Sequence, residues 1–197
     1  MRPKSIKIIT APATEPITSA EAKLHCRVDT DADDTIFTAL IEAARQACES
    51  ETQRALISQT LEATYAAWPE NGQGIWIPKP PLTSVTSVKY YDGDGVEQTL
   101  STDIYEADTA SEPGVISLKY GQTWPSLQGG KLAPITVRYV AGYANAAAVP
   151  DSLRVGMLLC IGHWYKHREE VVTGTIVSKT PYAAETLFGL NAARWGY

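Results

Sequence analysis

Apolar residues near the start of the chain follow the three- and four-residue spacing of a helix. We expect this helix at 18–28, with Leu24 and Val28 pointing inward. Thr18 and Glu21 mark its start as the ends of a capping box, in which each side chain satisfies a backbone N–H of the other residue. The segment therefore predicts a short, capped helix.

Two longer segments carry more extensive apolar patterns. At 33–54 an apolar stripe lies opposite a charged face, as expected of an amphipathic helix. At 150–170 a strongly apolar segment begins with Pro150 and Asp151, which both favour a helix N-terminus. With the helix at 18–28, these segments predict a small bundle of three helices.

Between the second and third helices the hydrophobic period changes to two. Apolar and polar residues alternate from Ile57 to Tyr65, and Asp92-Gly-Asp-Gly95 supplies the positive φ of a tight hairpin turn. Further short strands are expected at 75–77, 85–91, 96–100, 104–107, 115–118 and 135–140. The predicted strands thus lie together between the second and third helices. This order predicts an α+β fold with an antiparallel β block inserted at 57–141.

The end of the chain has no pattern that could form a core of its own. It nevertheless carries Phe188, Trp195 and Tyr197, and burying each large apolar side chain is worth roughly 1.5–3 kcal/mol. We therefore expect a single domain at 1–170 and an extended C-terminal arm at 171–197. The arm would lie on its own domain or dock on another subunit.

Composition and charge limit the classes of function. The 197 residues are 44% hydrophobic and 20% charged, so a core can form without disulfides or metal. Cys26, Cys48 and Cys160 are expected to be buried free thiols, as in a reducing compartment. The net charge of −5 argues against a protein that binds DNA by neutralising its phosphates. No stretch is apolar over the ~20 residues that a membrane span requires.

A His-x-x-x-His pattern in the third helix is the main candidate for chemistry. His163 and His167 lie four residues apart with Cys160 one turn earlier, a face that could bind zinc or haem. However, the motif contains no acidic general base, and no second ligand cluster has metal-like spacing. We therefore predict no catalytic, metal-binding or cofactor-binding residue and a protein that is not an enzyme. The alternative is a metal-dependent hydrolase that uses His163, His167 and a carboxylate.

Two other groups of residues suggest binding surfaces. Trp76 and Trp124 in the β block could stack on a carbohydrate or peptide, although tryptophans beside proline in short strands usually close a core edge. At the end of the third helix, Arg168 and Glu169 are placed to reach a neighbour, and Arg is enriched at interface hot spots.

Several segments follow one another in a recognisable order and spacing. They lie at 16–28, 40–45, 54–60, 77–88, 137–143 and 149–169. Among them are Pro16-Ile-Thr-Ser-Ala-Glu21, Ile77-Pro-Lys-Pro-Pro-Leu82 and Trp164-Tyr-Lys-His-Arg-Glu169. Together they cover nearly the whole chain and resemble the tailed-bacteriophage head–tail connector proteins, also called adaptor or head-completion proteins.

The resemblance implies a structural virion protein of the neck, at the head–tail interface, that is assembled in the host cytoplasm. Such proteins form a ring of identical subunits, expected here to be a dodecamer, beneath the portal protein. The ring extends the DNA channel and receives the next neck or tail protein. DNA would pass without sequence-specific binding, which suits an acidic channel wall, and no membrane is involved. A phage, a prophage and a gene transfer particle fit equally well, and a stopper or tail terminator is the nearest alternative.

The resemblance also implies a role for the C-terminal arm. Portal or inter-subunit contacts are expected at Arg168, Glu169, Pro181, Tyr182, Leu187, Phe188, Leu190, Arg194, Trp195 and Tyr197. If the arm only docks on a partner, removing 181–197 leaves a folded, soluble protein that no longer joins portal-bearing heads.

Overall fold

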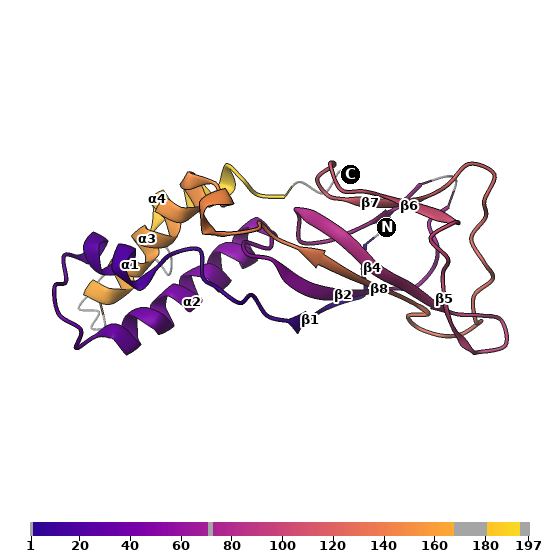
Figure 1. Cartoon of the computed structure of the whole chain (residues 1–197), viewed down its shortest axis with the longest axis horizontal. Coiled ribbons are helices and arrows are strands. Elements are labelled where there is room, and N and C mark those ends of the chain that lie inside the picture. The colour runs from indigo at the N-terminus through magenta and orange to yellow at the C-terminus, as the bar shows by residue number, and fades with distance from the viewer. Residues whose placement is uncertain (1, 71–72, 168–180, 194–197) are drawn as a thin grey trace. The chain divides into compact units, whose positions relative to one another are not determined.

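The computed structural model describes the chain in three stretches, namely residues 2–70, 73–167 and 181–193. The chain divides into two compact units, and most of their elements are labelled in Figure 1. Of the described residues, 14–57, 143–167 and 181–192 make up the helical unit. The described residues 2–13, 58–70, 73–142 and 193 make up the β unit. The β unit thus includes the predicted β block together with the N-terminal segment.

The helical unit contains the three helices expected from the sequence and one that was not expected. They are α1 (Ser19–Cys26), α2 (Asp34–Thr52), α3 (Asp151–Lys166) and α4 (Tyr182–Gly189). The capping box of α1 is confirmed, because Thr18 Oγ1 accepts from the Glu21 backbone N–H at 3.2 Å. In return, the Glu21 carboxylate accepts from the Thr18 backbone N–H at 2.8 Å. None of the helices in the described residues is long and apolar enough to cross a membrane.

All four helices contribute side chains to one apolar core. Its helical members are Ala22, Phe37, Ile41, Ala44, Cys48, Leu153, Met157, Cys160, Ile161, Ala184 and Phe188. Phe37 of α2 stacks on Tyr165 of α3 with ring centroids 4.6 Å apart. The expectation that Leu24 points inward is wrong: Leu24 is 80% exposed, because α1 buries the face that carries Ala22.

Helix α4 is part of this core rather than a free arm. Phe188 is 1% exposed and lies against Gly156 of α3, where an added Cβ would be 2.5 Å from the Phe188 ring. Just after the helix, Asn191 Nδ2 donates to Ser152 Oγ at 2.7 Å, and the Asn191 carbonyl accepts from Arg54 Nε. Removing 181–197 would therefore expose core, so we now expect this truncation to destabilise the helical unit.

A buried charge joins α2 to the segment before α1. Arg45 Nε donates to Glu15 Oε2 at 2.7 Å, and Arg45 Nη1 donates to Glu49 Oε2 at 3.1 Å. Glu49 Oε1 accepts from the Leu56 backbone N–H at 2.9 Å, so the same carboxylate also holds the chain beyond α2. Breaking such a buried pair typically costs about 3–5 kcal/mol, because it leaves one charge uncompensated.

The β unit is built from two sheets in which every strand pair is antiparallel. The five-stranded sheet has the order β1 (Ser5–Thr10), β2 (Gln59–Tyr65), β8 (Ile135–Ala141), β4 (Leu82–Tyr91) and β5 (Glu97–Thr99). The three-stranded sheet has the order β3 (Ile75–Trp76), β7 (Val115–Leu118) and β6 (Tyr105–Asp108). The α+β fold with an antiparallel β block is confirmed, whereas β1 was not predicted.

The smaller sheet covers one face of the larger sheet. Alternate residues of β2 and β8 are buried, as strand geometry requires of a half-buried sheet. Tyr65 of β2 reaches across, and its hydroxyl donates to the Trp76 carbonyl of β3 at 2.8 Å. Gly114, beside β7, approaches Leu82 of β4 so closely that an added Cβ would be 2.5 Å from the Leu82 side chain. The two sheets therefore enclose the core of the β unit.

Replacement of Phe188 tests whether α4 belongs to the core. We expect Phe188→Ala to lower the free energy of unfolding by about 3–5 kcal/mol, because it leaves a cavity beside Gly156. The matched control is Tyr182→Ala, at an 82% exposed position of the same helix, which should change stability by less than about 0.5 kcal/mol. Denaturant melts followed by circular dichroism measure both. Equal stability of the two variants would contradict the packing of α4.

The cap of α1 predicts a dependence of stability on pH. The hydrogen bond from the Thr18 backbone N–H lowers the pKa of Glu21, and the Thr18 hydroxyl and Arg154 lower it further. A lowered carboxyl pKa stabilises the folded state above the usual pKa, and this stabilisation is lost as the pH falls through the lowered value. Glu21→Gln should thus reduce stability at neutral pH by less than about 1 kcal/mol, since the group is half-exposed. The difference should shrink toward pH ~2. Melting curves of the wild-type protein and of Glu21→Gln measure this difference in stability. If the difference is the same at every pH, the charge of the Glu21 carboxylate is not its source.

Candidate assembly surfaces

The C-terminal residues that we expected to make contacts are split between the inside and the outside of the helical unit. Phe188 and the half-buried Leu187 belong to the side of α4 that packs inward. Tyr182 and Leu190, at the two ends of α4, are 82% and 72% exposed. Pro181 is half-buried and occupies the N-cap position of α4. Of the described candidates, therefore, only Tyr182 and Leu190 present large apolar surface to a partner.

The other predicted contact residues lie outside the described residues. They are Arg168, Glu169, Arg194, Trp195 and Tyr197. Their proposed role as portal or inter-subunit contacts stays a prediction.

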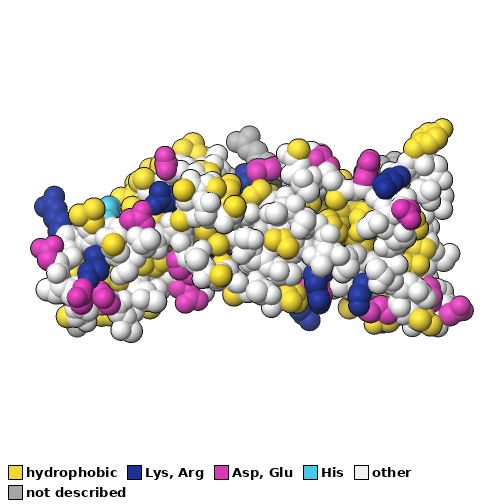
Figure 2. Space-filling view, in the orientation of Figure 1, with side chains coloured by type: hydrophobic (Ala, Val, Ile, Leu, Met, Phe, Trp, Pro, Cys, Tyr) yellow, Lys and Arg dark blue, Asp and Glu magenta, His cyan; other side chains and the backbone are white. Residues whose placement is uncertain are grey.

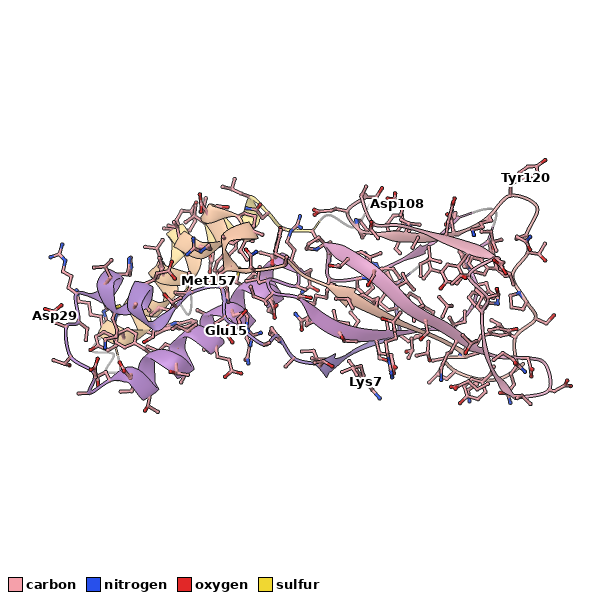
Figure 3. The ribbon with its side chains drawn as sticks, in the orientation of Figure 1. Lys7, Glu15, Asp29, Asp108, Tyr120 and Met157 are labelled. Atoms are coloured by element: carbon pink, nitrogen blue, oxygen red, sulfur yellow. The ribbon has the colours of Figure 1, made fainter. Side chains whose placement is uncertain are left out.

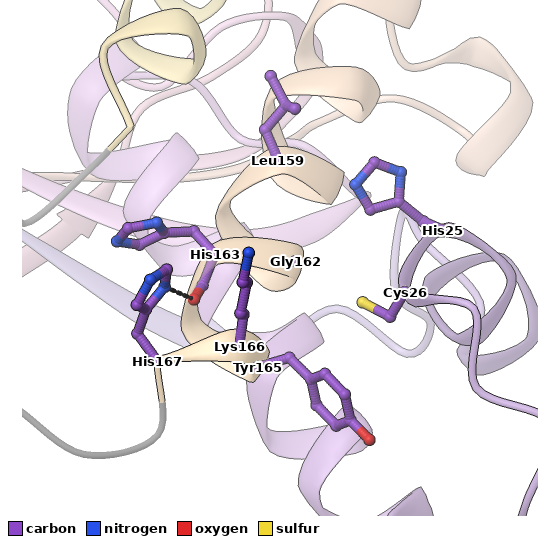
Figure 4. A pocket seen from close by; sticks show the side chains of 8 residues that line it. All are labelled: His25, Cys26, Leu159, Gly162, His163, Tyr165, Lys166 and His167. Carbon is purple, nitrogen blue, oxygen red and sulfur yellow. Dashed lines mark hydrogen bonds between the residues drawn. The ribbon is translucent and has the colours of Figure 1, made fainter.

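The predicted histidine face lines a surface cavity of about 590 Å³ in the helical unit (Figure 4). Its walls come from α1 and α3 and are formed by His25, Cys26, Leu159, Gly162, His163, Tyr165, Lys166 and His167. Gly162 leaves room for the His25 ring, because an added Cβ would be 3.2 Å from that ring. The sequence did not reveal that His25 and Cys26 join this face, since α1 and α3 are far apart along the chain.

Among the described residues, the side chains that line the cavity are not arranged as a metal site. His167 Nδ1 lies 2.9 Å from the His163 carbonyl, and the two imidazole rings are 4.5 Å apart. Within the described residues no three His, Cys, Asp or Glu side chains are arranged to hold a metal ion. Burial raises the pKa of the Cys26 thiol, which reduces its thiolate content and its reactivity. In the described part of the chain, this face therefore brings His25, Cys26, His163 and His167 to one cavity without arranging three of them around a common metal position.

The two tryptophans proposed as stacking platforms are engaged within the β unit. Trp124 stacks on Trp68 with ring centroids 4.6 Å apart and planes 7° apart, and Trp68 Nε1 donates to the Pro125 carbonyl at 2.8 Å. Trp76 is half-buried in β3, where its carbonyl accepts from Tyr65. One face of the Trp124 ring is therefore already covered by protein, as expected of a tryptophan that closes a core edge.

Exposed hydrophobic side chains occur on both units and are visible in Figure 2. In the β unit they include Tyr120 and Leu132, which lie in the connection between β7 and β8. Tyr120 projects away from the ribbon (Figure 3). Edge strand β1 exposes Ile6, Ile8 and Ile9, a group that sequence analysis missed because it did not predict β1. Contiguous exposed apolar residues mark candidate sites of protein–protein contact.

Known structures share this fold. The first is from the neck of an empty gene transfer agent (GTA) particle computed with C6 symmetry, with a TM-score of 0.76 and 23% sequence identity. A second is from the virion of a native GTA particle, with a TM-score of 0.74 and 22% identity. A third is from the neck of a native GTA particle computed with C12 symmetry, with a TM-score of 0.71 and 22% identity. Each comparison covers 98% of this chain and 97% of the other chain.

A comparison with family sequences agrees with the fold. No curated protein matches the chain. Residues 17–110 match the family described as phage gp6-like head-tail connector protein. The matched segment begins at the buried Ile17 beside the α1 cap and runs through α1, α2 and the strands from β2 to β6. Over residues 17–110 this chain is therefore similar to the phage gp6-like head–tail connector family.

Proposed function

We propose that this protein is a structural head–tail connector in the neck of a tailed-phage or gene-transfer-type particle. The observation that carries the proposal is the family match over residues 17–110, which takes in elements of both units. The fold shared with GTA neck structures over 98% of the chain supports it. In this role the protein extends the DNA channel beneath the portal and provides the docking platform for the next neck or tail protein.

The connector acts as a ring of identical subunits. The C6 and C12 symmetries of the similar neck structures favour a ring, and the C12 case favours twelve copies. The net charge of −5 suits a channel wall that DNA passes without specific binding, because like charge prevents adhesion to phosphates. The subunits would assemble in the host cytoplasm and remain in the virion neck.

A structural role also agrees with the chemistry of the helical unit. Among the described residues, no three side chains of its histidine-lined cavity are arranged to hold a metal ion, and burial raises the pKa of the Cys26 thiol. Helix α4 exposes two large apolar side chains at its ends, Tyr182 and Leu190. We assign these two, together with Arg168, Glu169, Arg194, Trp195 and Tyr197, to contacts with the portal or an adjacent subunit.

Removal of the protein from its particle tests the proposed function. Particles that lack this chain should accumulate as portal-bearing heads without tails, because the platform for the next component is missing. Electron microscopy of purified particles counts tailed and tailless heads, and expression of the full chain in trans should restore tails. Normal numbers of tailed particles without the chain would exclude a connector role.

Two double substitutions test whether the exposed apolar residues of α4 contact the portal, or whether the loss of exposed apolar side chains anywhere weakens binding. We expect Tyr182→Ala with Leu190→Ala to reduce binding to portal-bearing heads by about tenfold or more, because buried aromatic and aliphatic anchors dominate interfaces. Tyr120→Ala with Leu132→Ala removes the same residue types from exposed positions of the β unit and should retain binding to heads. Co-sedimentation with tailless heads measures both, and melting curves confirm folding. Equal binding by the two double variants would contradict the assignment to α4.

A further inference from the structure

The two outer edges of the five-stranded sheet carry opposite charge. Residues 2–13, which include edge strand β1, contain Arg2, Lys4 and Lys7 and no acidic residue. Residues 92–112, which include the opposite edge strand β5 and also β6, contain seven carboxylates and no lysine or arginine. The seven are Asp92, Asp94, Glu97, Asp103, Glu106, Asp108 and Glu112. Asp92, Asp94 and Glu97 lie in β5 or in the turn before it, whereas the other four lie after β5, in β6 or beside it. The segment with β1 is thus basic, and residues 92–97 at the opposite edge of the sheet are acidic.

Several of these charges are available to a partner. Every residue of β1 and of β5 is exposed. Lys4, Lys7 and Asp94 form no ion pair within the described residues, and Figure 3 shows Lys7 at the edge strand. The carboxylate opposite Lys7 in the sheet register, Glu62, is paired with Arg138 at 2.7 Å. Glu97 is bound on one side by Lys89 at 2.9 Å, from the neighbouring strand β4.

Both edges also offer backbone and apolar groups. In the described part of the sheet, β1 pairs only with β2 and β5 pairs only with β4, so each has one unpaired side. Ile8 of β1 is 59% exposed, and Val96, just before β5, is 55% exposed. An exposed strand edge with apolar side chains is a template for pairing with another chain.

We infer that β1 of one subunit lies against β5 of the next copy of this chain, and that this contact forms the ring. The inference rests on the proposed connector function, since that function requires the ring. A ring needs heterologous contacts, in which two different surfaces of one subunit are complementary. The basic edge and the acidic edge at opposite ends of one sheet fulfil this requirement.

The topology fixes the direction of the contact. Four antiparallel pairings lead from β1 through β2, β8 and β4 to β5, so β1 and β5 run in the same direction. A neighbour related by rotation about an axis along the strands therefore brings its β1 parallel to β5. The sheet then continues from subunit to subunit around the ring.

Charge reversal tests this contact. Lys4→Glu with Lys7→Glu should raise the concentration needed for ring assembly by about tenfold, and Asp94→Lys with Glu97→Lys should do the same, because each opposes like charges across the contact. Combining the four substitutions should restore assembly to within about threefold of wild type, since the two edges are again complementary. Native mass measurement and electron microscopy detect rings of the full chain, alone or on portal-bearing heads.

The matched control reverses two charges on the other acidic strand. Glu106→Lys with Asp108→Lys, in β6 of the smaller sheet, should leave assembly within about threefold of wild type. Melting curves exclude unfolding as the cause of any loss. The β1–β5 contact is overturned if the variant with all four substitutions does not recover ring assembly. It is also overturned if the β6 variant loses ring assembly to the same extent as the edge variants.

Cross-linking gives a second, independent measurement. In a Cys26→Ser background, Ser5→Cys with Gln98→Cys should give a ladder of multimers with a short bismaleimide, whose reach tolerates a shift in register. Ser5→Cys with Ala107→Cys, in β6, should give none. Rings that form normally but cross-link only through β6 overturn this inference and leave the connector role intact. If wild type forms no ring alone or on heads, the connector role fails and this inference fails with it.

Discussion

The pairing of β2 with β8 is the constraint on which the rest of the chain depends. A β block can be inserted between two helices only if the two ends of the block lie side by side. The β2–β8 register begins with Gln59 opposite Ala141, and Ile57 forms a bridge with Tyr143 in the helical unit. The chain thus leaves the helical unit and returns to it at one place. Helices α2 and α3 can then pack as neighbours although the whole β block separates them in sequence.

The sequence predicted those elements in which the order of apolar and polar residues matches which residues are buried. Strict alternation in β2 matches its alternating exposure, and the Thr18–Glu21 box depends only on residues three apart. Strand β1 was missed because all six of its residues are exposed, so no burial pattern marks it. Helix α4 is only eight residues long, and the burial of Phe188 depends on space above Gly156, which nothing near α4 in the sequence indicates.

The candidate site was less predictable than the fold, for a related reason. Motif spacing identified His163 and His167, but the cavity that they line is completed by His25 and Cys26 from α1, whose position is set by tertiary packing. Likewise, Tyr182 and Phe188 were assigned the same role because both are large and apolar. Packing gives them opposite roles: Phe188 stabilises the helical core, and Tyr182 is available to a partner.

The distribution of charge on the larger sheet addresses a problem that any ring subunit has. An exposed strand edge with apolar residues can pair with a second copy of itself, which yields closed dimers or aggregates. Lys7 on β1 and Lys4 just before it repel another β1, and the carboxylates in and beside β5 repel another β5, so both self-pairings are disfavoured. Only the pairing of unlike edges is attractive. Charge therefore selects the heterologous contact, and a heterologous contact whose rotation closes gives a ring rather than a dimer.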